Sequence, residues 1–440
     1  MDFLKWLYPG MHVKRWFLLL LVGITFFSLG IGYFLVQLYR EQPFPEAVAI
    51  VTLQFIPRVA RGIIFVGAGG VLAALAVIQL NRSLISAVIP GGQDNILNLV
   101  FQRRYLQRGP KVVAIGGGTG LSTLLRGLKS WTSNIAAVVT VADDGGSSGR
   151  LRRELGVLPP GDFRQCLVAL ADAEPLMTKL FQYRFGEGTG LEGHSFGNLF
   201  IVAMTAITGN FERALRESSR VLAVHGQILP STLANLTLVA EFEDQDRVSG
   251  ESQISKTHKA IKRVFLQPAR PGAYPEAVRS ILEADLIVIG PGSLYTSVMP
   301  NLLVEDIARA LKASSAVKVY VCNVATQEGE TDNLDASDHV LALTNHTGSN
   351  IIDYVLVNNN LGVPLPHHAK VSAVSAHGNL NAQRGQRIVL ADVIDPANPL
   401  RHDPKKLTQA LMRIYYERAQ VKEESAAEAD EASRKAMVQN

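Results

Sequence analysis

The chain has 440 residues, of which 47% are hydrophobic, and a formal net charge of +4 at pH 7. Ten of its 43 Lys and Arg residues, but only four of its 39 Asp and Glu residues, precede residue 111, so the positive excess belongs to the N-terminal part. A nucleic-acid-binding protein carries its basic residues on the folded domain, so this distribution argues against nucleic acid as a partner. Only Cys166 and Cys322 are present, without CxxC spacing, which argues against a disulfide framework or structural zinc and fits a reducing compartment.

Two apolar segments without charged residues stand out in the N-terminal part. Residues 16–39 are long enough to cross a bilayer as a helix, and the shorter segment 62–80 is rich in the Gly and Ala common in packed membrane helices. A cleaved signal peptide is the alternative for the first segment, but its apolar region is too long and no A-x-A-like site follows. Basic residues flank the pair, so the positive-inside rule predicts a multi-pass protein of the cell membrane with its C-terminal domain in the cytoplasm.

The composition predicts four regions along the chain. Residues 1–81 form two transmembrane helices with a short external loop, and residues 82–110 form a basic juxtamembrane linker. Within this linker, residues 94–108 have helical spacing, which suits either a helix lying along an anionic leaflet or a solvated linker helix. Residues 111–415 form the folded domain, and residues 416–440 form a charged tail that we expect to be disordered.

The folded domain alternates short β-branched segments with amphipathic ones. This pattern predicts an α/β fold with a Rossmann-like, mostly parallel sheet and helices on both faces. Residues 228–256 alternate as antiparallel hairpins do, so we expect an inserted or appended β element there. Asp403 and Pro404 predict the start of a last helix. The expected strands are residues 111–117, 135–142, 284–290, 316–324 and 354–359, and the expected helices are residues 121–131, 162–172, 198–207, 274–284 and 302–314.

A glycine-rich loop, "GGGTGL", follows the first expected strand at residues 116–121. Gly117, Gly118, Thr119 and Gly120 can bring backbone N–H groups close to a phosphate at the start of a helix. The spacing is neither GxGxxG nor that of a P-loop, and a plain strand-to-helix turn is the alternative interpretation.

The second expected strand ends in "DDGGSSGR", residues 143–150. Asp143 and Asp144 stand where a dinucleotide fold presents one acidic side chain to the ribose hydroxyls. With two carboxylates available, one can contact the ribose and the other a metal ion or a substrate hydroxyl. Ser147 and Ser148 lie in a glycine-rich run that can form a backbone nest for an anion, and Arg150 adds a fixed charge. The alternative is that one of the two aspartates caps a turn.

Four further loops carry candidate ligand-binding side chains. Asp162 begins a helix after "LPPG", either as its N-cap or as a ligand or metal contact, with Arg164 close behind it. Ser195 accompanies His194 and Asn198 in "GHSFGNLF". The full set from these loops is Arg164, His194, Asn198, Gly292, Ser293, Tyr295, Thr296, Asn323, Thr326 and Gln327.

Loops after parallel strands meet at one edge of the sheet, where α/β proteins bind their ligands. The six loops offer glycine amides, hydroxyls and side-chain amides, with no Ser-His-Asp order, HExxH or CxxC. They predict a site for a phosphorylated, hydroxyl-rich ligand. An NAD-dependent oxidoreductase is a further alternative, weakened by the missing GxGxxG and by the lack of a partner for hydride transfer.

Taken in chain order, these motifs resemble those of the YvcK-type gluconeogenesis factors, within the superfamily of the 2-phospho-L-lactate transferase CofD. The resemblance runs from residue 111 to about residue 415 and includes "GGGTG", "DDGGSSGRLR", "HSFGNL" and "GPGSLYTS". The N-terminal hairpin is an addition to the part that carries the resemblance.

The resemblance implies a regulator that binds a nucleotide sugar such as UDP-N-acetylglucosamine and acts in carbon metabolism, cell shape and cell-wall precursor supply. It also implies, as the alternative, a phospholactyl or phosphoryl transferase with a divalent metal on Asp144 and Asp162. No other cofactor is expected. The expected partners are the nucleotide sugar, the membrane through the N-terminal hairpin, cell-wall synthesis proteins and further copies of the chain in a homo-oligomer.

Overall fold

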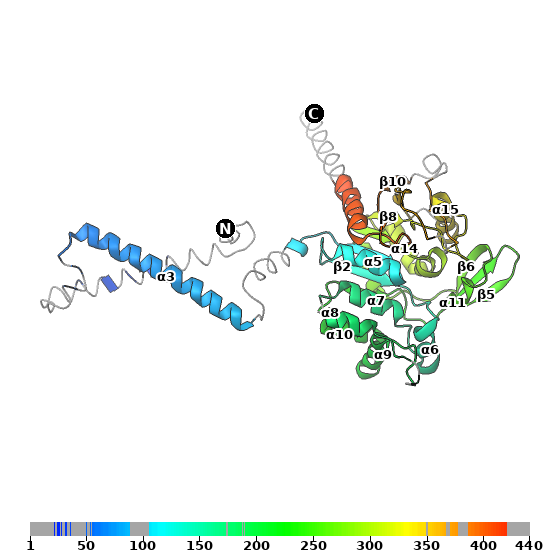
Figure 1. The fold of residues 1–440 in the computed structure, drawn as a ribbon, viewed down its shortest axis with the longest axis horizontal. Coiled ribbons are helices and arrows are strands. Elements are labelled where there is room, and N and C mark those ends of the chain that lie inside the picture. Colours follow the sequence, from blue (N-terminus) through cyan, green and yellow to red (C-terminus); the bar gives the residue numbers. More distant parts are fainter. Residues whose placement is uncertain are drawn as a thin grey trace, which may run out of the picture. The chain divides into compact units, whose positions relative to one another are not determined.

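The computed structural model describes residues 55–88, 105–172, 175–186, 188, 190–348, 351–366, 370–376 and 386–419, with isolated positions between residues 22 and 53. The chain divides into two compact units, Met1–Arg104 and Tyr105–Asn440, and each is considered by itself (Figure 1).

In the first unit, the helix α3 (Arg58–Val88) contains the second apolar segment predicted from the sequence. Its stretch Val59–Gln79 is the one helix among the described residues that is long and apolar enough to cross a membrane. The first predicted span, residues 16–39, lies largely outside the described residues, so the described part supports one candidate span and not the expected pair. The helix also continues past the predicted boundary at residue 81. The segment "NRSLISAV" is less hydrophobic than the residues before it, but its residues are still compatible with a helix.

The second unit is built on a seven-stranded sheet in the order β10-β9-β8-β7-β1-β2-β3, and every neighbouring pair is parallel. This arrangement confirms the predicted α/β fold with a mostly parallel sheet. All five expected strands are present, whereas the edge strands β3 and β10 were not expected as members of this sheet. The strands are β1 (Val112–Gly116), β2 (Ile135–Val139), β3 (Gln227–Pro230), β7 (Leu286–Ile289), β8 (Val317–Val321), β9 (Tyr354–Asn358) and β10 (Arg387–Ala391).

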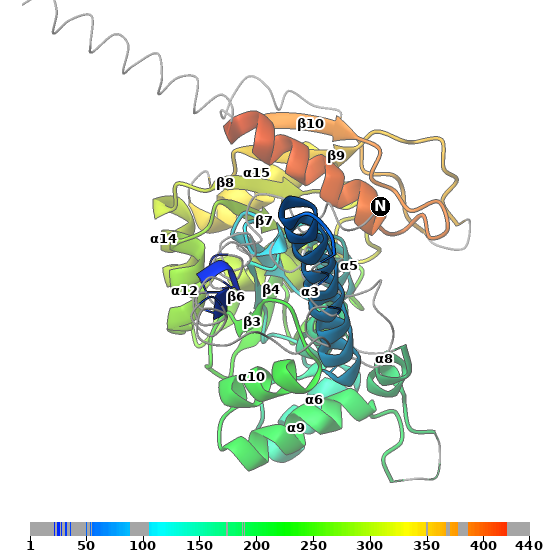
Figure 2. The ribbon, with the colours of Figure 1, turned by 90° about the vertical axis from the view of Figure 1, so that its left-hand side faces the viewer.

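Helices cover both faces of this sheet. The connections β1–α5–β2 and β7–α14–β8 run in opposite directions along the sheet, so right-handed crossovers place α5 and α14 on opposite faces. Figure 2 shows α6, α8, α9 and α10 gathered beyond the β3 side, where α10 packs against α9 and β3. The helices are α5 (Gly118–Leu128), α6 (Gly146–Leu155), α7 (Gly161–Leu170), α8 (Pro175–Gln182), α9 (Phe196–Thr208), α10 (Phe211–Val221), α12 (Pro275–Leu282), α14 (Glu305–Ala313), α15 (Ala336–Thr347) and a last helix over residues 404–419.

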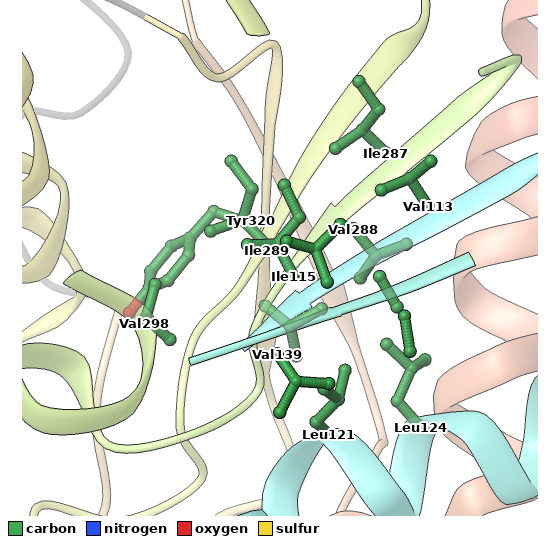
Figure 3. Close-up of a cluster of buried hydrophobic side chains, with 14 of the residues drawn as sticks. Val113, Ile115, Leu121, Leu124, Val139, Ile287, Val288, Ile289, Val298 and Tyr320 are labelled. Atoms are coloured by element: carbon green, nitrogen blue, oxygen red, sulfur yellow. The ribbon is translucent and has the colours of Figure 1, made fainter. Parts of the chain in front are cut away.

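The core lies on both sides of the central strands, which explains why their sequences are apolar without alternation. Every residue of β1, β2 and β7 is buried. Figure 3 shows Leu121 and Leu124 of α5 close to Val139 of β2 on one side of this cluster. A sheet buried in this way holds the loops at its carboxyl edge on a rigid base.

A separate antiparallel sheet, in the order β5-β4-β6, accounts for most of the predicted β element. It consists of β4 (Thr237–Phe242), β5 (Arg247–Ser249) and β6 (Ile261–Gln267), with the short helix α11 (Glu251–Ile254) between the last two. The expectation was wrong for residues 228–230, which belong to β3 of the parallel sheet. Because β3 is an edge strand, Pro230 fits there without the loss of an interior ladder bond.

The ends of the folded region agree only in part with the expected boundaries. The Asp403 carboxylate accepts the backbone N–H groups of Lys405 and Lys406 at 2.8 and 2.9 Å, which confirms the predicted cap. The last helix runs to residue 419, beyond the expected end of the domain at residue 415, and the rest of the predicted tail lies outside the described residues.

Candidate functional site

The strand order creates a reversal of direction between β1 and β7. From β1 the chain continues to β2 on one side, and from β7 it continues to β8 on the other. Loops at such a reversal diverge to opposite faces and leave a crevice beyond the carboxyl ends of the strands, which is where open α/β sheets bind ligands. The loops after β1, β2, β7 and β8 therefore belong to one neighbourhood.

The glycine-rich loop brings the ends of β1 and β7 into contact. Gly117 is the N-cap of α5 and Gly118 has a φ of +59°, a conformation that favours glycine. A Cβ atom on Gly120 would lie 2.4 Å from the carbonyl oxygen of Pro291, so no larger residue fits there without displacing backbone. The predicted loop is thus a close-approach turn, with Thr119 donating its hydroxyl to Gln165 at 3.2 Å.

Asp162 lies against this same loop. A Cβ atom on Gly117 would be 2.5 Å from Asp162 Oδ2, and the carboxylate accepts the backbone N–H of Gly118. Of the two alternatives for Asp162, the N-cap is wrong, because α7 begins at Gly161 and Pro160 is the N-cap. Burial and the nearby Asp143 raise the pKa of Asp162 to about 7, so near neutral pH this carboxyl group exists in both protonation states.

Asp143 and Asp144 make different contacts at the end of β2. Asp143 Oδ1 accepts the N–H of Gly145 at 2.9 Å, and burial raises the Asp143 pKa above its ordinary value. Asp144 Oδ1 accepts the backbone N–H of Ser252 at 2.8 Å, in the first turn of α11. Asp144 therefore fastens α11 and the antiparallel sheet to the carboxyl edge, whereas the bond from Gly145 to Asp143 fits the alternative that one aspartate caps a turn.

Ser147 and Ser148 lie in the first turn of α6, which begins at Gly146, so the expected backbone nest is the start of a helix. Ser147 Oγ lies 3.0 Å from His194 Nδ1 and accepts a hydrogen bond from Asn198 Nδ2 at 3.0 Å. Ser148 Oγ accepts the N–H of Gly161 at 3.0 Å. Burial lowers the pKa of His194, which favours a neutral ring in this cluster.

Arg164 places a guanidinium group beside these residues. Only 9% of its surface is exposed, and its Nε atom has no hydrogen-bond partner within the described part of the chain. A Cβ atom on Gly197 of α9 would lie 2.8 Å from Arg164 Cγ and Cδ, so glycine makes room for this side chain. A buried donor without a partner is costly, which makes Arg164 a strong candidate for contact with an anion.

The loops after β7 and β8 are joined by reciprocal hydrogen bonds. Asn323 Nδ2 donates to the carbonyl oxygen of Gly292 at 3.0 Å, and Asn323 Oδ1 accepts the N–H of Gly292 at 3.4 Å. Ser293 donates its hydroxyl to Gln327 Oε1 at 2.7 Å. The two loops thus form one unit next to the glycine-rich loop.

Glu330 holds two of the predicted ligand residues in place. Its Oε1 accepts the N–H groups of Tyr295 and Thr296 at 2.7 and 3.1 Å, and its Oε2 accepts the Thr296 hydroxyl at 3.2 Å. Tyr295 and Thr296 lie within the π-helix Leu294–Val298, which leads into α13 (Met299–Leu302). Tyr295 and Thr296 are buried, so their observed role is to shape the loop.

Two predicted residues point to other partners. Thr326 Oγ1 accepts the N–H of Ser372 at 2.9 Å, and Arg150 donates to the carbonyl oxygen of Glu192 at 2.5 Å. Each of these two side chains therefore bonds to the backbone of a distant segment of the chain.

Three residues that the sequence analysis did not single out belong to this neighbourhood. Burial and the negative charges of Asp143, Asp162 and Asp144 raise the pKa of Glu251 to about 8. Asn301 donates to the carbonyl oxygen of Gly116 at 3.1 Å, while its own Oδ1 has no partner among the described residues. Glu330 is the third. Asn301 and Glu330 had a signal in the sequence, since they lie in the motifs "GPGSLYTSVMPNLL" and "CNVATQEGET", whereas Glu251 had none.

The acidic residues do not form a complete metal site by themselves. No group of three or more His, Cys, Asp or Glu side chains within the described residues is arranged to hold a metal ion. Asp144 and Asp162 each use a carboxyl oxygen on a backbone N–H group. Two carboxylates fit Mg²⁺ only where a substrate phosphate and water supply the other ligands.

Comparison with known proteins identifies relatives that match most of the second unit. The family described as "2-phospho-L-lactate transferase CofD" matches residues 112–394. A protein of Bacillus subtilis named "Gluconeogenesis factor" is 49% identical over 315 residues, which cover 70% of this chain and 99% of that protein. A Nostoc sp. relative, whose name also refers to a gluconeogenesis factor, is 46% identical over 429 residues and covers 94% of this chain and 93% of its own length.

The Nostoc match includes most of the residues before 105, because only 6% of the chain lies outside it. The N-terminal segment is therefore shared with at least one relative. Among solved structures, a crystal structure of a UPF0052 family member from Bacillus halodurans is 48% identical, with a TM-score of 0.66, and covers 69% of this chain and 99% of that one.

Proposed function

This chain belongs to the CofD family, and from that premise we propose that it is a membrane-anchored regulator whose cytoplasmic domain binds a nucleotide sugar of the UDP-N-acetylglucosamine type. Its relatives are named gluconeogenesis factors, so the proposed role lies in gluconeogenic carbon flow. We extend this role to cell shape and the supply of cell-wall precursors, which use the same sugars.

One observation carries the proposal: the loops after β1, β2, β7 and β8 contact one another at the reversal point of the sheet. Glycine amides and hydroxyl groups there suit the phosphates and hydroxyls of a nucleotide sugar. The buried Arg164 has an unpartnered Nε, and a diphosphate would supply the missing acceptor and a compensating charge. Because Asp162 has a pKa of about 7, it can be neutral when an anion approaches the glycine-rich loop.

Calorimetric titration of the full chain with UDP-N-acetylglucosamine tests this proposal. We expect saturable binding, and we expect Arg164→Gln to weaken it by roughly tenfold or more, because a charge-assisted hydrogen bond is worth about 1.5–3 kcal/mol. Arg153→Gln is the matched control, since Arg153 is an exposed arginine on α6 without an ion pair among the described residues.

Two results would overturn the proposal. One is the absence of any binding heat at millimolar nucleotide sugar. The other is an equal affinity of the parent chain and the Arg164→Gln variant, provided that both melt at the same temperature.

The second candidate is a metal-dependent transferase of the phospholactyl or phosphoryl type. The proximity of Asp143, Asp144, Asp162 and Glu251 favours it, because like charges gathered at low solvent exposure attract a cation. A metal bound to these carboxylates would stabilise the charge of a leaving diphosphate. Mg²⁺-dependent consumption of a nucleotide-activated donor, lost in Asp162→Asn, would favour this candidate over the regulator.

A further inference from the structure

The opposite edge of the parallel sheet carries a basic cavity that the proposed function does not use. Its volume is about 320 Å³, and its wall includes Lys318, Tyr354 and Arg387, at or next to the starts of β8, β9 and β10. Asp353 and Arg418 complete the charged lining. Because all strands are parallel, this amino edge lies at the far end of the strands from the loops of the candidate site.

The backbone around the cavity is tied together by hydrogen bonds between neighbouring strands. Asp353 Oδ2 accepts the N–H of Lys318 at 2.9 Å, and the N–H of Asp353 donates to the carbonyl oxygen of Lys318 at 2.9 Å. The N–H of Arg387 donates to the carbonyl oxygen of Asp353 at 2.9 Å. The starts of the three strands therefore form a fixed frame, and Arg418 reaches it from the last helix, which Figure 2 shows beside β9 and β10.

The charges of this cavity are not balanced. Lys318 is largely buried, with 12% of its side chain exposed, and its Nζ lies 3.9 Å from Asp353 Oδ2. Arg387 and Arg418 form no ion pair with any described residue. Three cations thus face one carboxylate, and that carboxylate is already engaged by a backbone N–H group.

We propose that this amino-edge cavity is a second ligand site, which binds a phosphate group through Arg387, Arg418 and Lys318. Two arginines beside a partly buried lysine suit a phosphate, because guanidinium groups bind its oxygens in pairs and the lysine adds a point charge. The volume lies at the lower end of small-ligand sites and is sufficient for a sugar phosphate or a lipid headgroup.

The path of the chain makes both sources of phosphate relevant. Residues 105–111 enter the second unit at this same edge, since the Lys111 N–H bonds to Asp285 just before β7 and the Ser133 N–H bonds to Leu106 just before β2. The candidate membrane segment precedes these residues in sequence. A phosphate reaching the cavity therefore comes either from an anionic lipid headgroup or from a free phosphorylated metabolite.

Binding to the full chain in neutral detergent tests the proposal and separates the two sources. The soluble probes are inorganic phosphate and glucose 6-phosphate, and the lipid probe is dioctanoyl phosphatidylglycerol, with dioctanoyl phosphatidylcholine as its zwitterionic counterpart. We expect at least one of the anionic probes to bind, and we expect Arg387→Ala and Arg418→Ala each to weaken this binding by roughly tenfold. Tighter binding of the glucose phosphate identifies a metabolite site, and tighter binding of phosphatidylglycerol identifies a lipid site.

Arg413→Ala is the matched control, because Arg413 is an exposed arginine on the same helix, five residues earlier and therefore on a different face. If no anionic probe binds at 10 mM, a concentration about tenfold above a millimolar Kd, the proposal is wrong. It is also wrong if Arg387→Ala, Arg418→Ala and Arg413→Ala change affinity equally. Arg387→Ala and Arg418→Ala also distinguish this site from the proposed nucleotide-sugar site, since both variants are expected to leave the binding of UDP-N-acetylglucosamine unchanged.

Discussion

At the scale of single residues, Glu251 shows how the carboxyl edge concentrates negative charge. This side chain is only partly exposed, and burial together with Asp143, Asp162 and Asp144 raises its pKa from 4.5 to about 8. The folded protein therefore keeps this proton over a range of pH in which the unfolded chain has lost it. The stability contributed by the protonated form is complete below about pH 4.5 and is lost as the pH rises through 8.

We predict that Glu251→Gln stabilises the protein at alkaline pH, because the neutral amide avoids the cost of a buried charge among other carboxylates. At pH 9 the variant is expected to exceed the parent chain by about 1 kcal/mol or more, which corresponds to roughly 2–4 °C in Tm. At pH 5 the two chains are expected to melt together. Thermal melts of the full chain between pH 5 and pH 9 measure this difference, with the exposed Glu154→Gln as the control.

If the Tm of Glu251→Gln and the Tm of the parent chain change with pH in the same way, the pKa of Glu251 is not raised and the prediction is wrong. The same thermal melts also test the metal-dependent transferase. A cation bound among these carboxylates would lower their pKa values, so the Tm of the parent chain would fall less steeply with rising pH.

The residues of the site could be predicted from the sequence only where a motif follows a strand directly. Asp143, Asn323 and Ser293 were found because each comes within a few residues of a buried strand. Glu251 was missed because its closeness to Asp144 depends on the folding of the antiparallel sheet, which residue spacing does not reveal. For Asp162 the sequence left an N-cap and a ligand or metal contact open, because residue spacing does not show that its side chain turns to the glycine-rich loop of a different element.

At the scale of elements, the contact between α5 and the loop after β7 determines how closely the loops after β1 and β7 approach each other. Gly120 lies in the first turn of α5, where alanine would ordinarily gain about 1 kcal/mol of helix propensity. A Cβ atom there would lie 2.4 Å from Pro291 O and 2.9 Å from Gly292 Cα, and both of these atoms are backbone. The steric cost therefore outweighs the gain in propensity.

We predict that Gly120→Ala lowers the free energy of unfolding by about 1–3 kcal/mol, the usual cost of overpacking a filled contact. It is also expected to weaken nucleotide-sugar binding, because the loops after β1 and β7 must separate. Gly272→Ala is the control, since no atom lies within 4 Å of its added Cβ. Chemical denaturation and calorimetry on both variants measure the effects, and equal stability of the two variants would contradict the prediction.

The order of elements was easier to predict than their assembly. Apolar runs such as Leu286–Ile289 identify buried parallel strands because both faces of the sheet are covered. The assignment of residues 228–230 to a hairpin failed because a short edge strand ending in proline has too few residues to show a period. The position of β1 between β7 and β2 could not be read from the sequence, since pairing partners depend on crossover direction.

At the scale of the whole molecule, two units differ in what stabilises them. The second unit has its own core, and the Bacillus subtilis relative matches 70% of this chain over 99% of its own length, so the family fold does not require the remaining part. The apolar residues of α3 at positions such as Val66, Val71 and Leu72 are exposed within the first unit, with 60–78% of their surfaces accessible. An apolar helix that is not covered by protein needs another apolar environment.

We predict that the full chain is recovered in the membrane fraction of cells and resists extraction by alkaline carbonate, whereas a chain of residues 105–440 is recovered in the supernatant. Leu72→Lys tests α3 in the full chain, because a lysine near the centre of a membrane helix costs about 2.5–3.5 kcal/mol. This variant is expected to reduce the membrane-bound fraction, and Leu282→Lys, at an exposed position of α12, is the control. If the full chain is recovered in the supernatant, α3 does not anchor it. If Leu72→Lys and Leu282→Lys fractionate alike while residues 105–440 are soluble, the anchor lies elsewhere in the first unit.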